Sequence, residues 1–204
     1  MPGQWLIEQG LTTTGSILRW FRDNFAGAER IVAGELGASS YDLISQEAAG
    51  AKPGSDKLLL LPFFMGAKAT RWNPAARGAL FGLTLDHGRK ELARAIMEGV
   101  AYELRACLDV LEGMKMLPEQ IVLMGGGSKG ELWNQIKANV TGFSVGLPKQ
   151  TEAASLGAFI LAGAGIGLFP DPGATSRTLN PVVRKFEVNQ GDKTVYDSLY
   201  PLYN

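Results

Sequence analysis

Apolar residues recur every three or four positions along several stretches of the chain, and other stretches carry short continuous apolar runs. The first pattern is typical of helices with one buried face, and the second of strands in a covered sheet. The longest helical pattern has apolar residues at Leu92, Ile96, Val100 and Leu104. Together the patterns predict strands at 4–9, 58–61, 78–83, 121–124 and 143–147, and helices at 16–25, 40–49, 89–114, 132–140, 152–163 and 193–202.

Three stretches rich in Gly and Pro have no such period, and we predict loops at 50–56, 63–77 and 165–180. A structureless stretch as long as 63–77 is usually ordered by its contacts or functional. The order of strands and helices predicts an α/β fold, a mixed sheet layered with helices.

The stretch 121–134 joins a predicted strand to a predicted helix through Gly125-Gly126-Gly127. The run Ile121 to Met124 predicts a strand buried on both faces. Glycine permits positive φ and a close approach of a ligand to the backbone, and a helix start carries partial positive charge. A phosphate or a ribose hydroxyl could bind there. The alternative is a plain tight turn, which needs fewer glycines than this stretch has.

Two nucleotide-binding motifs do not fit these glycines. A dinucleotide fingerprint needs an acidic residue after the next strand, and the predicted strand 143–147 ends without one. A phosphate-binding P-loop needs Gly-Lys-Ser/Thr, whereas here Lys129 precedes Gly130 and Glu131 follows it.

The composition of the chain argues against several classes of function. The chain has 204 residues, 20 basic and 20 acidic, which argues against nucleic acid or an anionic membrane as a partner. The only cysteine, Cys107, lies on an apolar helix face and is predicted to be an inert buried thiol. The only histidine, His87, is predicted to cap the helix that follows it or to lie at the surface. One histidine and one cysteine are too few side chains for a typical zinc site. Without a bilayer-length apolar run or a signal peptide, we expect a cytoplasmic protein.

Four segments together carry a family resemblance. Residues 78–83 read Gly-Ala-Leu-Phe-Gly-Leu, and residues 91–99 continue the same spaced pattern of small and apolar positions. With residues 61–74 and 152–158 and the glycine turn, they resemble the C-terminal domain of the FGGY carbohydrate kinases, and most of all the xylulokinases. In this resemblance residues 61–74 correspond to the inter-domain loop and the glycine turn to the adenosine-binding loop.

The resemblance implies the actin/hexokinase-like ATPase fold, which is ribonuclease H-like. Residues 1–204 would be its C-terminal, nucleotide-side half, with the N-terminal sugar-binding domain absent. It implies transfer of the γ-phosphate of ATP to a sugar hydroxyl, with Mg²⁺ bridging the phosphates and an aspartate as general base. In the family that aspartate lies upstream of the Gly-x-Trp strand, which is residues 3–5 here. We therefore assign no catalytic and no metal residue, and expect the chain alone to be inactive.

The resemblance also implies which residues contact the nucleotide. Three glycines would form the shelf for adenosine, and Gly130 would offer only backbone where relatives often carry Asn or Ser. The implied contacts are Gly15, Arg19, Gly125, Gly126, Gly127 and Gly130.

Alternatives remain open. The sugar would be D-xylulose, with gluconate, ribulose and erythritol as other acceptors of the family. A non-catalytic, actin-like nucleotide-binding module is the alternative from another class, and an NAD-binding domain is a weaker one. We also expect a homodimer, because strand 4–9 would have an unpaired edge and leave Trp5 and Ile7 uncovered.

Overall fold

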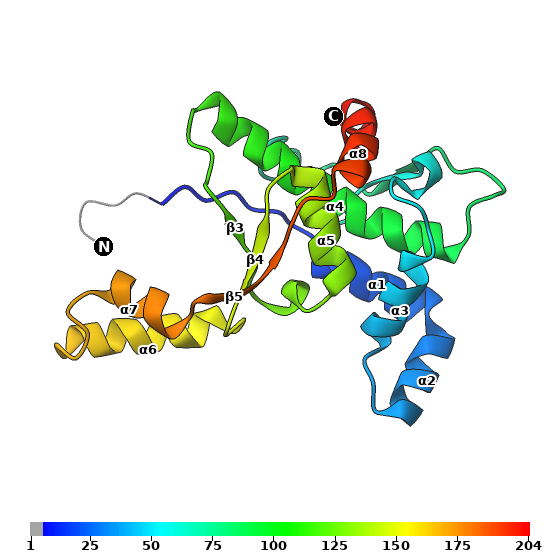
Figure 1. Ribbon diagram of the computed structural model, residues 1–204. Helices are drawn as coiled ribbons and strands as arrows, with labels where there is room; N and C mark the ends of the chain where they lie inside the picture. Colours follow the sequence, from blue (N-terminus) through cyan, green and yellow to red (C-terminus); the bar gives the residue numbers. More distant parts are fainter. Residues whose placement is uncertain (1–5) are drawn as a thin grey trace.

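The computed structural model describes residues 6–204, and helix α4 (Arg89–Gly113) runs through the centre of the domain (Figure 1). Its residues Ile96, Met97 and Tyr102 are at most 1% exposed. Every residue from 93 to 103 is buried, so the middle of α4 is covered on all sides and not only along the predicted apolar stripe. Several elements pack around α4, among them α1 (Gly15–Phe25), α3 (Ser40–Ala49), α5 (Glu131–Thr141) and β1 (Leu59–Leu61).

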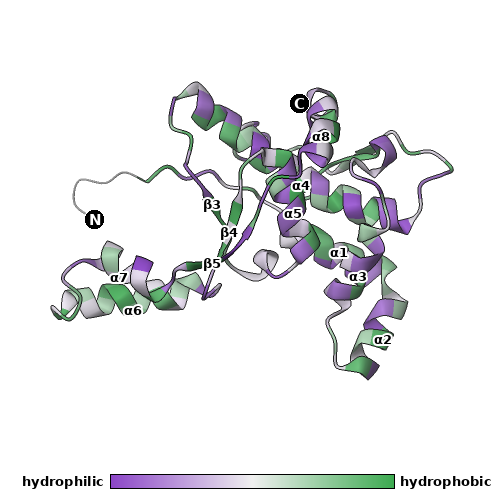
Figure 2. Cartoon of the chain, viewed as in Figure 1, coloured by the Kyte–Doolittle hydropathy of each residue, from purple (hydrophilic) through white to green (hydrophobic). Residues whose placement is uncertain are grey.

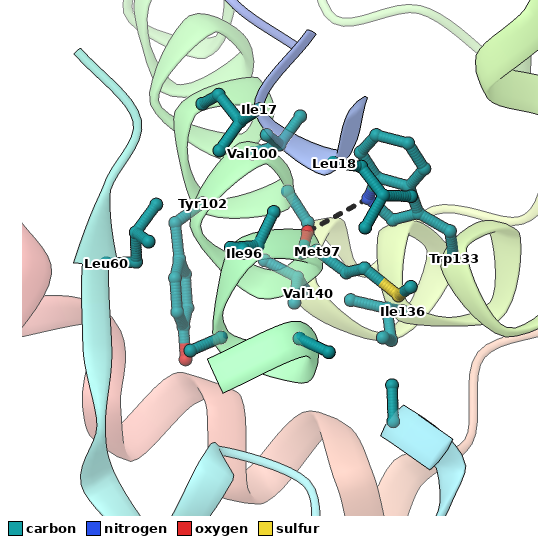
Figure 3. Packing of buried hydrophobic residues seen from close by; sticks show 14 of the residues in the cluster. Ile17, Leu18, Leu60, Ile96, Met97, Val100, Tyr102, Trp133, Ile136 and Val140 are labelled. Atoms are coloured by element: carbon teal, nitrogen blue, oxygen red, sulfur yellow. Dashed lines mark hydrogen bonds between the residues drawn. The ribbon is translucent and has the colours of Figure 1, made fainter. Parts of the chain in front are cut away.

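Strand β1 approaches α4 very closely at Gly99. A Cβ at this position would overlap the carbonyl oxygen of Leu60, so only glycine fits without a shift of the strand. Figure 3 shows Leu60 beside α4 and, on another side of the helix, Ile17 and Leu18 of α1. The C-terminal helix α8 (Gln190–Tyr203) completes this core with Tyr196, Leu199, Tyr200 and Tyr203.

The strands form two small sheets. In the first, β1 pairs antiparallel with β2 (Ala79–Phe81). In the second, β4 (Val145–Pro148) pairs parallel with β3 (Ile121–Val122) and antiparallel with β5 (Val182–Phe186). The second sheet is therefore mixed, as the α/β prediction required.

Helices α6 (Ala153–Gly165) and α7 (Pro172–Leu179) lie on the other side of this sheet from α1 to α3 (Figure 1). Only Ile160 and Gly163 of α6 are buried. The helix contains no charged residue, and Figure 2 shows it without strongly hydrophilic positions. Apolar side chains on more than one face of α6 and just after it are therefore exposed: Phe159, Leu161 and Ile166 are 55%, 64% and 83% exposed.

Two α-helices and one strand of the structure were not predicted from the sequence. Helix α2 (Gly27–Leu36) buries only Ala33, so its apolar residues form no stripe. Helix α7 lies within the predicted loop 165–180. It begins at Pro172, and the side chain of Asp171 accepts hydrogen bonds from the N–H groups of Gly173 and Ala174. Strand β5 has three exposed residues in a row, which hides its alternation.

Two predicted strands need correction. Residues 6–9 form no strand, and the remaining positions of the predicted strand 4–9, with Trp5, lie outside the described residues. The strand predicted at 121–124 is regular only at Ile121–Val122 and is half-buried rather than covered on both faces, because β3 is an edge strand. Met124, at its end, is 50% exposed.

Candidate functional site

The three glycines form the turn between β3 and α5, and their backbone faces open space. Gly125 has φ +76°, in the left-handed region that favours glycine. A short 3₁₀ helix (Gly126–Ser128) follows it. A Cβ on Gly126 or Gly127 would meet no protein atom within 4 Å. The fold therefore does not need glycine at these two positions, and the bare backbone is available to a ligand.

This loop forms one wall of a cleft of about 620 Å³. The start of α1 and helix α3 form the other walls, and α1, α3 and α5 converge in Figure 1. This volume is typical of small-molecule sites. The residues around the cleft are Gly15, Leu18, Ser39, Tyr41, Asp42, Ser45, Gly126, Gly127, Lys129, Gly130 and Trp133.

Four of the six predicted nucleotide contacts lie around this cleft: Gly15, Gly126, Gly127 and Gly130. The other two do not line it. Gly125 holds the loop in place, since its N–H donates to the carbonyl of Thr151 at 2.8 Å and its carbonyl accepts from Ser128 Oγ at 2.7 Å. Arg19 points into solvent with a 71% exposed side chain, and its Nε lies 3.6 Å from Asp23.

Helix α3 contributes Tyr41, Asp42 and Ser45, which the sequence analysis did not single out. Ser45 Oγ would lie 4.0 Å from a Cβ on Gly130, so α3 and the start of α5 meet at the bottom of the cleft. The sequence predicts helix 40–49 but carries no signal for its packing against the glycine turn. Asp42 provides the one carboxylate of the lining, and Lys129 the one ammonium.

Behind the loop, helix α5 holds the loop carbonyls. Asn134, which is fully buried, donates from Nδ2 to the carbonyl of Ser128 at 2.7 Å. Lys137 Nζ donates to the carbonyl of Gly127 at 2.8 Å. Burial lowers the pKa of Lys137 to about 8.

The single histidine and the single cysteine both make contacts that support the fold, and neither lines the cleft. His87 Nδ1 accepts a hydrogen bond from the N–H of Thr84 at 2.9 Å, which closes the turn before α4. Cys107 is buried, and this burial, with the nearby Glu103, raises the pKa of its thiol to about 11. A protonated, covered thiol is inert, as predicted.

A buried charge cluster around Glu98 lies in the core, and its residues do not line the cleft. Glu98 is 1% exposed and accepts hydrogen bonds from Arg94, Tyr196, Ser55 and the N–H of Gly54. Burial raises the pKa of Glu98, opposed by the Arg94 guanidinium. All its contacts are internal, so the cluster joins η1 (Ser55–Lys57), α4 and α8.

Comparison with known proteins identifies the family. Residues 1–166 match the C-terminal domain of the FGGY family of carbohydrate kinases. The chain belongs to this family. Among its relatives is the gluconokinase of Bacillus subtilis, which is 34% identical over 200 residues, 98% of this chain and 39% of the relative.

Solved kinase structures of Lactobacillus acidophilus have the same fold. Its gluconate kinase matches with a TM-score of 0.79 and 28% identity, and its xylulose kinase with 0.76 and 27%. Each match covers 93% of this chain and 36% of the other. The chain thus has the fold of the C-terminal half of these kinases and spans less than two fifths of the length of the relatives named here. The matched relatives are named for different acceptors: gluconate, xylulose and, for a kinase of Escherichia coli that is 32% identical over 98% of this chain and 39% of the relative, autoinducer-2.

Among the described residues, no helix is long and apolar enough to cross a membrane.

Proposed function

We propose that this chain is the ATP-binding domain of a kinase that transfers the γ-phosphate of ATP to a sugar hydroxyl. One observation carries the proposal: bare glycine backbone at Gly126 and Gly127 faces a cleft that the start of α1 also lines. Backbone without side chains allows a nucleotide to approach, and family membership supplies the reaction class.

The cleft has the chemistry for a nucleotide. Tyr41 provides aromatic surface for a base, and Lys129 provides a charge for phosphate. Among residues 6–204, no three acidic, histidine or cysteine side chains cluster as they would around a metal ion. We propose that Mg²⁺ would be held by the phosphates of ATP and would supply positive charge for the transfer.

The acceptor is proposed from the resemblance and the relatives. The sequence motifs favour D-xylulose, and the match to the gluconokinase of B. subtilis favours gluconate as the second candidate. Both offer hydroxyl groups to the γ-phosphate, and the resemblance implies that the general base is an aspartate outside the matched domain. A cytoplasmic location suits a reaction that consumes ATP.

Calorimetric titration of the chain with ADP and Mg²⁺ tests the proposal. We expect a dissociation constant of about 1 mM, equivalent to about −4 kcal/mol, because the walls described here cover only part of a nucleotide. Gly126→Val should abolish the heat signal, since the added side chain enters the cleft without touching the protein.

The matched control is Gly113→Val at the end of α4, where a Cβ also meets no atom within 4 Å and which lies outside the cleft lining. This variant should bind ADP like the unchanged chain. Equal affinity of Gly126→Val and Gly113→Val would show that the nucleotide binds elsewhere.

A further inference from the structure

Lys137 is a buried lysine with no carboxylate partner. Its residue is 7% exposed, and its Nζ lies 2.8 Å from the carbonyl oxygen of Gly127, 3.5 Å from Asn134 Oδ1 and 4.6 Å from the centre of the Trp133 ring. All three partners are neutral. No ion pair of the described residues includes Lys137, and burial alone lowers its pKa. A methionine would fill the same space without the cost of desolvating a charge.

The ammonium group lies directly behind the glycine loop. A second cavity of about 340 Å³ lies there, and Lys137 lines it with Thr14 and Leu104. Gly126, Gly127 and Trp133 line both this cavity and the cleft. The loop is thus a thin wall between the two spaces, with the ammonium on one side and the cleft on the other.

With the hydrogen bond from Lys137, the carbonyl groups of Gly125, Gly127 and Ser128 each accept a side-chain hydrogen bond. The carbonyl of Gly125 accepts from Ser128 Oγ, and that of Ser128 accepts from Asn134 Nδ2. The carbonyl of Gly127 accepts from Lys137 Nζ. With its carbonyls held from behind, the loop keeps one conformation, and preorganisation of this kind increases affinity.

We propose that Lys137 is a positioning residue of the nucleotide site, which holds the Gly127 carbonyl and whose positive charge is balanced by the phosphates of the bound nucleotide. This inference rests on the proposed function. It explains why a costly charge occurs where an apolar side chain would fit: the anion that compensates it belongs to the ligand. A purely structural role makes the opposite prediction, because replacing the charge with an apolar side chain of similar size should then leave nucleotide binding unchanged.

Three variants of the chain test this inference: Lys137→Met, which removes the charge, Lys137→Arg, which keeps it, and Lys52→Met, a control with an 82% exposed side chain. ADP affinity is measured by calorimetry, stability by thermal melting, and exchange of the loop amides 125–128 by NMR. For Lys137→Met we expect about tenfold weaker ADP binding and about tenfold faster loop exchange, with an unchanged or higher melting temperature. Lys137→Arg should recover most of the affinity, and Lys52→Met should match the unchanged chain.

Two results would overturn the inference, and they differ. If Lys137→Met binds ADP as tightly as the unchanged chain and its loop exchanges at the same rate, Lys137 does not position the site, while the proposed function stands. If the unchanged chain does not bind ADP at all, the proposed function fails, and this inference fails with it. A loss of affinity accompanied by an equal loss of stability in both Lys137 variants would mark a structural role and also overturn it.

Discussion

The indole Nε1 of Trp133 donates a hydrogen bond to the carbonyl oxygen of Met97 over 3.0 Å (Figure 3). Trp133 is 5% exposed and lines the cleft, and Met97 is fully buried in the middle of α4. The bond therefore ties the helix that follows the glycine loop to the central helix of the core. The position of the loop depends on this attachment.

We predict that Trp133→Phe lowers the free energy of unfolding by about 1–2 kcal/mol, because it removes this hydrogen bond and part of the ring volume. Urea denaturation measures the change, and ADP affinity should fall in the same variant. Trp20→Phe is the control, since Trp20 is 38% exposed and packs on Phe25 and Phe64 through its ring alone. An equal effect of the two variants would contradict the role of the Trp133 bond.

Two glycines of α4 should respond in opposite ways to alanine. Gly99→Ala should cost about 2–3 kcal/mol, because its Cβ overlaps the carbonyl oxygen of Leu60. Gly113→Ala should be neutral or stabilise by up to about 1 kcal/mol, since its Cβ meets nothing within 4 Å and alanine favours helix. Urea denaturation of both variants checks the pair. A neutral Gly99→Ala would mean that β1 does not press on α4.

Stability should rise with pH through the titration of Lys137. Its pKa is lowered to about 8 in the folded chain and is about 10.4 in an unfolded one, so the unfolded chain binds more protons between these values. Stability therefore increases as pH rises from about 8, by about 2 kcal/mol between pH 7 and 9.5. Burial raises the pKa of Tyr102, Tyr196, Tyr200 and Tyr203, which adds a second pH dependence at the alkaline end. The measured quantity is therefore the difference between the unchanged chain and Lys137→Met. A constant difference across this range would exclude the assigned titration.

We predict that the chain forms a homodimer through the exposed residues of α6 rather than through a strand at 4–9. Leu161→Lys should shift the equilibrium to the monomer, because it places a charge in an apolar surface. Leu36→Lys on α2 is the control, with Leu36 70% exposed. Light scattering at increasing concentration measures the mass, and a monomer at roughly 100 μM, where an interface worth about −8 kcal/mol would be mostly formed, would contradict this prediction.

We also predict that the chain alone has no sugar kinase activity with D-xylulose or gluconate. The cleft lining offers one carboxylate, Asp42, and the resemblance assigns the general base to another domain. A coupled assay for ADP release measures turnover. Acceptor-dependent turnover well above background would show that this chain carries a complete catalytic site.

The elements whose signal is local were predictable from the sequence. Helix 89–114 has a stripe repeated over its whole length, and the glycine turn stands out because three glycines separate two clear patterns. Helix α7 also had a local signal, the Asp171-Pro172 cap, which the many glycines and prolines around it obscured. Only part of the mixed sheet was predictable from the sequence. Strand β5 buries few residues, so its sequence does not alternate between apolar and polar positions.

The glycines of the candidate site were predictable from the sequence, whereas the side chains that line the rest of the cleft were not. Tyr41, Asp42 and Ser45 reach the cleft because α3 packs beside α5, and this is a tertiary contact with no counterpart in the local pattern. The same holds for Lys137. Its place on helix α5 is readable from the sequence, whereas its burial depends on the loop and on α4.

The walls of the cleft come from distant parts of the chain, with Gly15 and Ser45 near its beginning and Gly126 and Trp133 well beyond its middle. Contacts between such distant segments are costly to form, since closing a long loop costs entropy before the contacts compensate it. A nucleotide that bridges these walls would act as a ligand of the native state alone. At ten times its dissociation constant it would add about 1.4 kcal/mol to the stability of the domain. The supply of nucleotide would then influence how much of the protein is folded.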